Sequence, residues 1–196
     1  MSTISHTKPQ VRPSGVDREN RAIAMTVFSL LKPGRRYIQW LVFRLSPLQP
    51  DTDIDDLEMI HFARLALISR FPDHGQPRDD LRQVIQLFES NYNGSFAQYI
   101  DTFVDVIPKK MKSFWSTSYG FPRGLPLGPF KRYISANEFP IDHYYVRHPD
   151  ATVKMVASAL RVVRVNAQLL HDAQRLDAAA FAERFRTLVT DIQSDL

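Results

Sequence analysis

The chain has 196 residues, with 25 Lys and Arg against 21 Asp and Glu and no cysteine. This length fits one domain with its own hydrophobic core, and the lack of cysteine excludes disulfide bonds, thiolate metal sites and a cysteine nucleophile. The formal charge of +4 is spread over interspersed basic and acidic residues, which favours a soluble protein and predicts no nucleic-acid partner.

The N-terminal 20 residues are rich in Ser, Thr, Pro and charge, and they contain no hydrophobic region of a signal peptide. They carry too little apolar surface to offset the entropy of ordering, so we expect a disordered tail over residues 1–20. The longest uncharged apolar run, residues 22–31, is far shorter than the roughly 20 residues of a bilayer span. We therefore expect a cytoplasmic protein with no transmembrane segment.

Four segments have the composition of β-strands. Residues 22–31 are a compact apolar run closed by Lys-Pro-Gly, and residues 61–69 and 84–91 alternate between two sets of side chains. Residues 141–147 are rich in aromatic and β-branched side chains. Phe88 lies in the third segment, which we expect to be central in the sheet, with Phe88 buried.

Helical periodicity lies between and after these strands. Apolar residues recur at helical spacing over residues 35–48, and again after a turn in which Ser95 is the expected N-cap. The second helix is expected to run to about residue 108 and to resume through residue 115, and a short helix is expected over residues 130–138. Two last helices follow residue 151, and Asp177 is expected to cap the second of them.

The predicted order is strand, helix, strand, strand, helix, strand, followed by two helices. This order predicts an α+β protein with a ferredoxin-like βαββαβ antiparallel sheet over residues 21–150 and two helices on one face. The other face needs a cover, because large exposed apolar patches are rare on monomers. Three covers are possible. They are the C-terminal helices of residues 151–196, which pack on the core or on a partner; a second copy of the chain; and a bound ligand.

Polar side chains capable of chemistry form a band on three of the predicted strands. The candidates for a catalytic site are His61, Arg64, Glu89, Asn91, His143 and Tyr145, with Tyr144 beside the last. Arg64 and Glu89 could clamp a substrate, but a structural ion pair is the more common arrangement. The histidines lack the spacing of a metal motif, so no metal site is predicted. The cluster Lys109, Lys110 and Lys112 either suits a helix end or contacts an anion or membrane.

Several runs carry a family resemblance: LKPGRR from residue 31, HFAR from 61, LFESNYNGSFAQYIDTF from 87, YGFPRG from 119 and HYYVRHPDAT from 143. With these runs the chain resembles a group of bacterial proteins of uncharacterised activity with ferredoxin-like domains. That group is distantly similar to the dimeric α+β barrel superfamily, which includes dye-decolourising peroxidases and small monooxygenases. The resemblance implies the fold over roughly residues 25–160. The Gly-x-x-Asp-Gly distal motif of the peroxidases is missing, so a haem peroxidase is not expected.

Two functional hypotheses remain, and neither identifies a cofactor. The first is a binding protein for an apolar small molecule or a protein partner, including a homodimer formed through the open sheet face. The second is a small oxidoreductase of monooxygenase or peroxidase-like type, in which His61 or His143 handles a proton and Arg64 and Asn91 position an oxyanion. A pocket of a few hundred Å³ that contains His61, Arg64 or Glu89 would favour the enzyme.

Overall fold

The computed structural model describes residues 22–46, 57–78 and 80–195. The predicted tail of residues 1–20 lies outside the described residues. The elements in chain order are β1 (Ala22–Leu30), α1 (Arg36–Leu45), β2 (Ile60–Arg70), β3 (Asp80–Asn93), α3 (Phe96–Val106), α4 (Pro108–Trp115), α5 (Leu127–Asn137), α6 (Val153–Ala173), α7 (Ala178–Asp191) and the 3-10 turn η2 (Gln193–Asp195).

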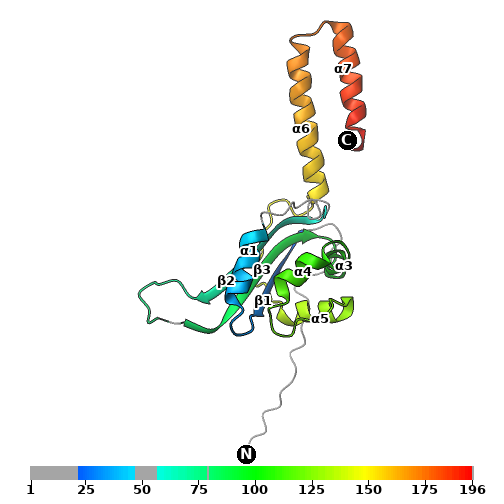
Figure 1. The fold of residues 1–196 in the computed structure, drawn as a ribbon. Coiled ribbons are helices and arrows are strands. Elements are labelled where there is room, and N and C mark those ends of the chain that lie inside the picture. Colours follow the sequence, from blue (N-terminus) through cyan, green and yellow to red (C-terminus); the bar gives the residue numbers. More distant parts are fainter. Residues whose placement is uncertain (1–21, 47–56, 79, 196) are drawn as a thin grey trace, which may run out of the picture.

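The protein is an α+β protein built on a three-stranded antiparallel sheet with strand order β1-β3-β2 (Figure 1). The first three predicted strands are confirmed, and β3 is the central strand. It pairs with β1 from Leu30↔Ile85 to Ala22↔Asn93, and with β2 along its other edge.

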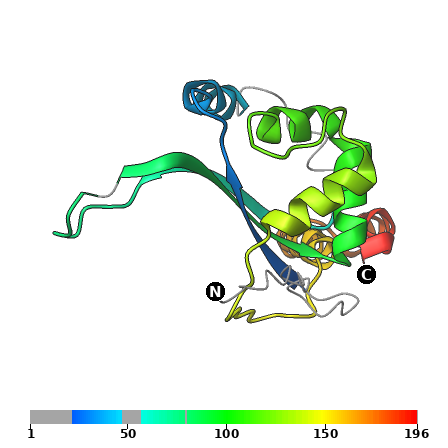
Figure 2. The same cartoon turned by 90° about the horizontal axis from the view of Figure 1, so that it is seen from below.

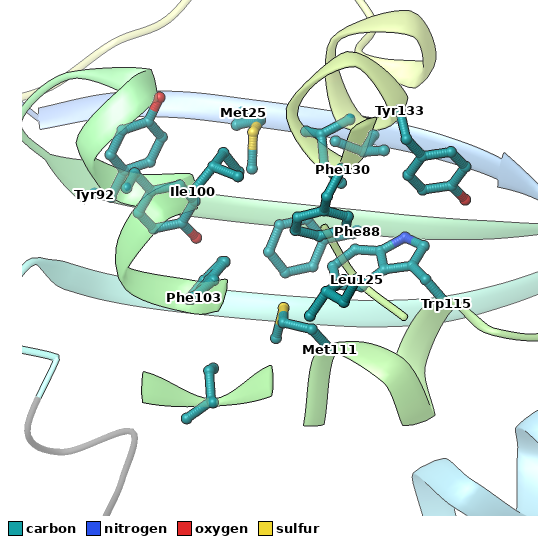
Figure 3. Close-up of a cluster of buried hydrophobic side chains, with 14 of the residues drawn as sticks. Met25, Phe88, Tyr92, Ile100, Phe103, Met111, Trp115, Leu125, Phe130 and Tyr133 are labelled. Atoms are coloured by element: carbon teal, nitrogen blue, oxygen red, sulfur yellow. The ribbon is translucent and has the colours of Figure 1, made fainter. Parts of the chain in front are cut away.

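One face of the sheet is covered by helices. Gln86, Phe88, Ser90 and Tyr92 alternate along β3 and are all buried, since side chains two residues apart share a face of a strand. Phe88 is 4% exposed, and its ring meets that of Trp115 edge-on at 5.1 Å between centroids. Figure 3 shows the aromatic and aliphatic side chains that fill this layer, and Figure 2 shows that α1 lies on the same side as α3, α4 and α5.

Side-chain caps begin three of the helices, as the sequence predicts for two of them. Ser95 accepts a hydrogen bond from the Gln98 N–H at the start of α3, and Asp177 accepts from the N–H groups of Ala179 and Ala180 at the start of α7. Thr152 caps α6 in the same way. These caps satisfy N–H groups that have no partner inside a helix, which explains where each helix starts.

The fourth predicted strand is wrong, because residues 141–147 are irregular in the structure. The segment still follows the outer edge of β1: the Phe139 N–H donates to the Thr26 carbonyl at 2.7 Å, and the Ala22 N–H donates to the Pro149 carbonyl at 3.3 Å. The eleven residues 139–149 lie beside only five residues of β1, 22–26, so the chain between the two hydrogen bonds must bow away from the strand. Pro140 and Pro149 also lack the N–H that a ladder needs.

The two C-terminal helices form a hairpin that projects away from the sheet (Figure 1). Their existence is confirmed, and in Figure 1 they do not lie over the open sheet face. The hairpin is attached where the Asn93 side chain, at the end of β3, accepts a hydrogen bond from the Val153 N–H at 3.0 Å. Among the described residues, no helix has both the length and the apolar content to cross a bilayer.

Candidate functional site

Arg64 and Glu89 form the charged centre of the open sheet face. The two residues are directly opposite each other on β2 and β3, and the Arg64 guanidinium lies 2.5 Å from the Glu89 carboxylate. Their side chains are 61% and 31% exposed. A pair this exposed contributes little to stability, because water and salt screen it. The two predicted site residues are therefore in contact as an exposed ion pair.

The other predicted site residues are more dispersed. Asn91 is half-buried and lies two residues beyond Glu89 on the same face of β3. His61 is exposed at the start of β2, beside a shift in register between Ile60 and Phe62. His143 and Tyr145 are exposed on the irregular segment that is bonded to β1. The two histidines therefore belong to segments at opposite edges of the sheet.

A small apolar pocket lies between β2 and the helices α3 and α4, on the covered side of the sheet. Its volume is about 160 Å³, and it is lined by Ile60, Ala63, Arg64, Leu65, Phe88, Phe103, Ile107, Met111 and Phe114. This volume is below that of ordinary small-molecule sites, although a cavity of comparable size can hold a benzene-sized molecule. Arg64 is the one charged residue of the lining, and His61 and Glu89 are not part of it. The size criterion for an enzyme site is therefore not met here.

Metal-binding geometry is also missing from the part of the chain that the structure describes. No three His, Asp or Glu side chains come together there in a group that could hold an ion.

Helix α6 is apolar on two opposite sides, and only one of them has a neighbour in the structure. One row of side chains on α6 faces α7, and its members are spaced at intervals of four and three residues. These side chains are all half-buried: Ser158, Val162, Val165, Leu169 and Asp172. Ser158 donates to Asp195 at 2.7 Å, and Asp172 accepts from Arg184 at 3.2 Å. Leu188 and Ile192 are the buried residues on the α7 side. These contacts hold the hairpin together from one side of α6.

The second row on α6 is not covered by any part of the chain that the structure describes. The exposed row, as we call it, repeats at spacings of four, three, four and three residues and contains Val156, Leu160, Val163, Ala167 and Leu170. Leu160 is 55% exposed, Val163 63% and Leu170 62%. At 100° per residue this row points about 160° away from the row that faces α7. None of the 21 residues of α6 is buried.

The helical period after residue 151 predicted the helix, but the two rows were not distinguished in that prediction. The signal was present, because a helix with one apolar face shows one stripe and α6 shows two. By their spacing, Arg161, Arg164, Gln168 and His171 share a polar side of the helix between the two rows. A helix that is apolar on opposite sides normally packs between two neighbours.

Comparison of the chain with protein-family models, with curated proteins and with solved structures finds no match.

Proposed function

We propose that the protein is a non-catalytic binding protein that associates with a second copy of itself through the exposed row of α6. The observation that supports this proposal is the second apolar row on a helix that has no buried residue. Its spacing of three and four residues is that of the core positions of a coiled coil, in which each side chain fits between four of the facing helix.

The row is self-complementary when two copies of α6 run antiparallel about a two-fold axis at Val163. This arrangement sets Leu160 of one copy against Ala167 of the other, and Val156 against Leu170. A large side chain then meets a small one at each inner layer, which fills the interface without a cavity. A parallel pair would instead set Ala167 against Ala167 and leave a gap.

The charge of the hairpin also supports self-association. Residues 153–195 contain six Lys and Arg and five Asp and Glu, so two hairpins approach each other with little net repulsion. The arginines of α6 lie beside the exposed row and not within it, since Arg161 and Arg164 are on the adjacent polar side. An interface centred on Val163 therefore buries no charge.

A small apolar molecule is a second candidate partner. The pocket of about 160 Å³ below Arg64 supports it, because its lining is almost entirely aliphatic and aromatic. A ligand that fits must be about the size of one aromatic ring. We rank a small-molecule partner second because the exposed row of α6 is more extensive than the pocket and is not covered by the described residues.

The oxidoreductase alternative has less support. His61 and His143 lie on segments at opposite edges of the sheet, and the pocket contains neither of them. The ferredoxin-like plan remains a proposal that the strand order β1-β3-β2 supports, because an added strand beside β1 would complete it. A cytoplasmic location likewise remains a proposal, supported by the absence of cysteine.

Because the chain contains no cysteine, cross-linking can test the antiparallel pair directly. Val163→Cys places one thiol at the proposed axis, and we expect it to form a disulfide-linked dimer under mild oxidation. Gln168→Cys, on the polar side of the same helix, is the matched control and should stay uncross-linked at the same protein concentration. A mixture of Leu160→Cys and Ala167→Cys should cross-link between the two variants. Equal cross-linking of Val163→Cys and Gln168→Cys would contradict the proposal.

A further inference from the structure

Helix α1 has the reverse of the usual pattern of burial. Its one buried side chain is the amide of Gln39, whereas its large apolar side chains are exposed: Tyr37, Ile38, Trp40, Leu41 and Leu45. Tyr37 is 77% exposed and Trp40 56%. Monomeric proteins seldom expose so many large apolar side chains together, and such a patch usually marks a binding surface.

Polar contacts and one aromatic contact fix this orientation. The Gln39 carboxamide oxygen accepts a hydrogen bond from the Thr117 hydroxyl, and its amide nitrogen donates to the Ser113 carbonyl at 3.4 Å. On the same side of α1 the ring of Phe43 meets that of Phe114 at 6.0 Å between centroids. By helical spacing the opposite side is the one that carries Tyr37 and Leu41. We call that side, with Ile38, Trp40 and Leu45, the outer face of α1.

Within the described segment that contains α1, every charged residue is basic. Residues 22–46 contain no Asp or Glu, and their four basic residues are Lys32, Arg35, Arg36 and Arg44. Arg36, Trp40 and Arg44 follow one another at intervals of four residues, so they share one side of the helix. Trp and Tyr next to Arg are typical of helices at a boundary between water and an apolar phase.

A cavity lined by arginines opens beside the start of α1. Its volume is about 490 Å³, and its lining consists of Arg36, Ser69, Arg70, Arg78, Leu81 and Val84. The charged side chains of its described lining are three arginines, from α1, β2 and the β2–β3 loop. Guanidinium groups bind phosphate oxygens through paired hydrogen bonds, so this arginine cavity suits a phosphate group.

We propose that the outer face of α1 and the arginine cavity together bind the anionic surface of a phospholipid bilayer. The apolar side chains of α1 enter the boundary between headgroups and acyl chains, and Arg36 and Arg70 of the cavity hold lipid phosphates. Basic and apolar side chains contribute together to such binding, because each basic residue near an anionic surface adds electrostatic attraction to the burial of apolar area.

Two other occupants fit the same features less well. A second copy of the chain would bring Arg36 and Arg44 of both copies together across a two-fold axis, and like charges at an interface are costly. Single-stranded nucleic acid would use the arginines and Trp40, but it gains nothing from Ile38, Leu41 and Leu45, because bases stack on aromatic rings and not on aliphatic side chains. The aliphatic side chains therefore favour a lipid surface.

The two tryptophans make binding directly observable. Trp40 is 56% exposed and Trp115 is 1% exposed, so a change in the environment of Trp40 is seen over a constant signal from Trp115. We expect the emission of the full chain to shift to the blue on addition of phosphatidylcholine vesicles that contain phosphatidylglycerol. Vesicles of phosphatidylcholine alone should produce little shift. Trp40→Phe should remove the shift while co-sedimentation with the vesicles persists.

Two pairs of arginine variants separate the contribution of basic side chains at the proposed surface to vesicle binding from the effect of net charge. The double variant Arg36→Gln and Arg70→Gln should lower the vesicle partition coefficient roughly thirtyfold, since each basic residue near the surface contributes a factor of about five. The control pair Arg164→Gln and Arg186→Gln removes the same charge from the hairpin and should change it by less than about twofold. Leu41→Ser should lower partitioning roughly tenfold, and Val106→Ser, an exposed change on α3, should not.

The proposal is independent of the self-association through α6, so a monomeric α6 variant should still bind the vesicles. Equal losses in the two arginine pairs would overturn the proposal, as would equal binding to both kinds of vesicle or binding to neither. Arginine-dependent binding of a single-stranded oligonucleotide without vesicle binding would assign the surface to nucleic acid instead. Stabilisation of the chain by inorganic phosphate without vesicle binding would reduce the proposal to a site for free phosphate.

Discussion

The Asn93 side-chain oxygen accepts a hydrogen bond from the Val153 N–H at 3.0 Å, and this contact joins the end of β3 to the first turn of α6. The two residues are 60 positions apart in the chain. Asn93 is 8% exposed, so the hydrogen bond is largely shielded from water. With Thr152 bonded to the Met155 N–H, it satisfies two of the N–H groups at the start of α6 and fixes where the hairpin leaves the sheet.

Asn93→Ala removes this contact and should loosen the hairpin more than the sheet. We expect a loss of about 1–2 kcal/mol in the free energy of unfolding, because a helix start loses a shielded acceptor. Hydrogen–deuterium exchange should become faster in the first turns of α6 and stay slow in β3. Asn91→Ala, two residues away on the same face of the strand, is the control. Unchanged exchange in α6 would show that the hydrogen bond does not anchor the helix.

The buried hydroxyl of Tyr99 predicts loss of stability at alkaline pH. Burial raises the pKa of Tyr99 far above its ordinary value, and the hydrogen bond from its hydroxyl to Ser90 Oγ, at 2.6 Å, opposes this only in part. The unfolded chain ionises this tyrosine near pH 10 while the folded chain keeps the proton. Stability from this group is therefore complete below about pH 10 and is lost as the pH rises further, by up to about 1.4 kcal/mol per pH unit.

Tyr99→Phe tests that assignment by chemical denaturation at a series of pH values. The variant should lose about 0.5–1.5 kcal/mol at neutral pH, since it loses one buried hydrogen bond. Above pH 10 its stability should fall less steeply than that of the unmodified chain, because one fewer group gains a proton on folding. Parallel decreases for the two proteins would refute the role of Tyr99.

Phe88→Ala should be among the most destabilising single changes. The side chain is 4% exposed at the centre of β3 and packs on Trp115, so its removal leaves a cavity and should cost about 3–5 kcal/mol. Phe62→Ala is a matched control on β2, where the ring is 49% exposed, and should cost less than about 1.5 kcal/mol. Similar midpoints for the two variants in urea would mean that the core is not centred on β3.

Glu89→Gln distinguishes a structural ion pair from a functional one. Because Arg64 is 61% exposed, breaking its 2.5 Å contact with Glu89 should cost less than about 1 kcal/mol and the difference should shrink as salt is added. Denaturation at low and high ionic strength measures this. A loss of several kcal/mol that does not depend on salt would indicate that the pair is coupled to a more buried network.

Most strands and helices of the α+β core could be predicted from the sequence because local patterns determine them. Apolar alternation located β2 and β3, and Ser95 and Asp177 identified helix starts, since these are signals within a few residues. Residues 141–147 were misread as a strand because their composition suits one. The structure instead ties residues 139 and 149 to β1 and leaves a bowed segment between them. That outcome depends on Pro140, Pro149 and the length of the connection, which composition does not report.

The candidate binding surfaces were harder to predict from the sequence than the strands. The sequence grouped residues 35–48 as one amphipathic helix and did not foresee that Gln39 would be its buried side chain, because that depends on partners at Ser113 and Thr117. The arginine cavity joins Arg36 to Arg70 and Arg78, which no spacing along the chain relates. By contrast, the exposed row of α6 could have been found from its spacing alone.

Light scattering coupled to size-exclusion chromatography tests the central claim, that the exposed row of α6 joins two copies of the chain. The unmodified protein should elute with twice the chain mass of 22.6 kDa. Val163→Glu should elute as a monomer with unchanged helix content, because it sets two carboxylates against each other at the axis, whereas Gln168→Glu should remain dimeric. A monomeric unmodified protein at micromolar concentrations, or a dimer that Val163→Glu leaves intact, would contradict the claim.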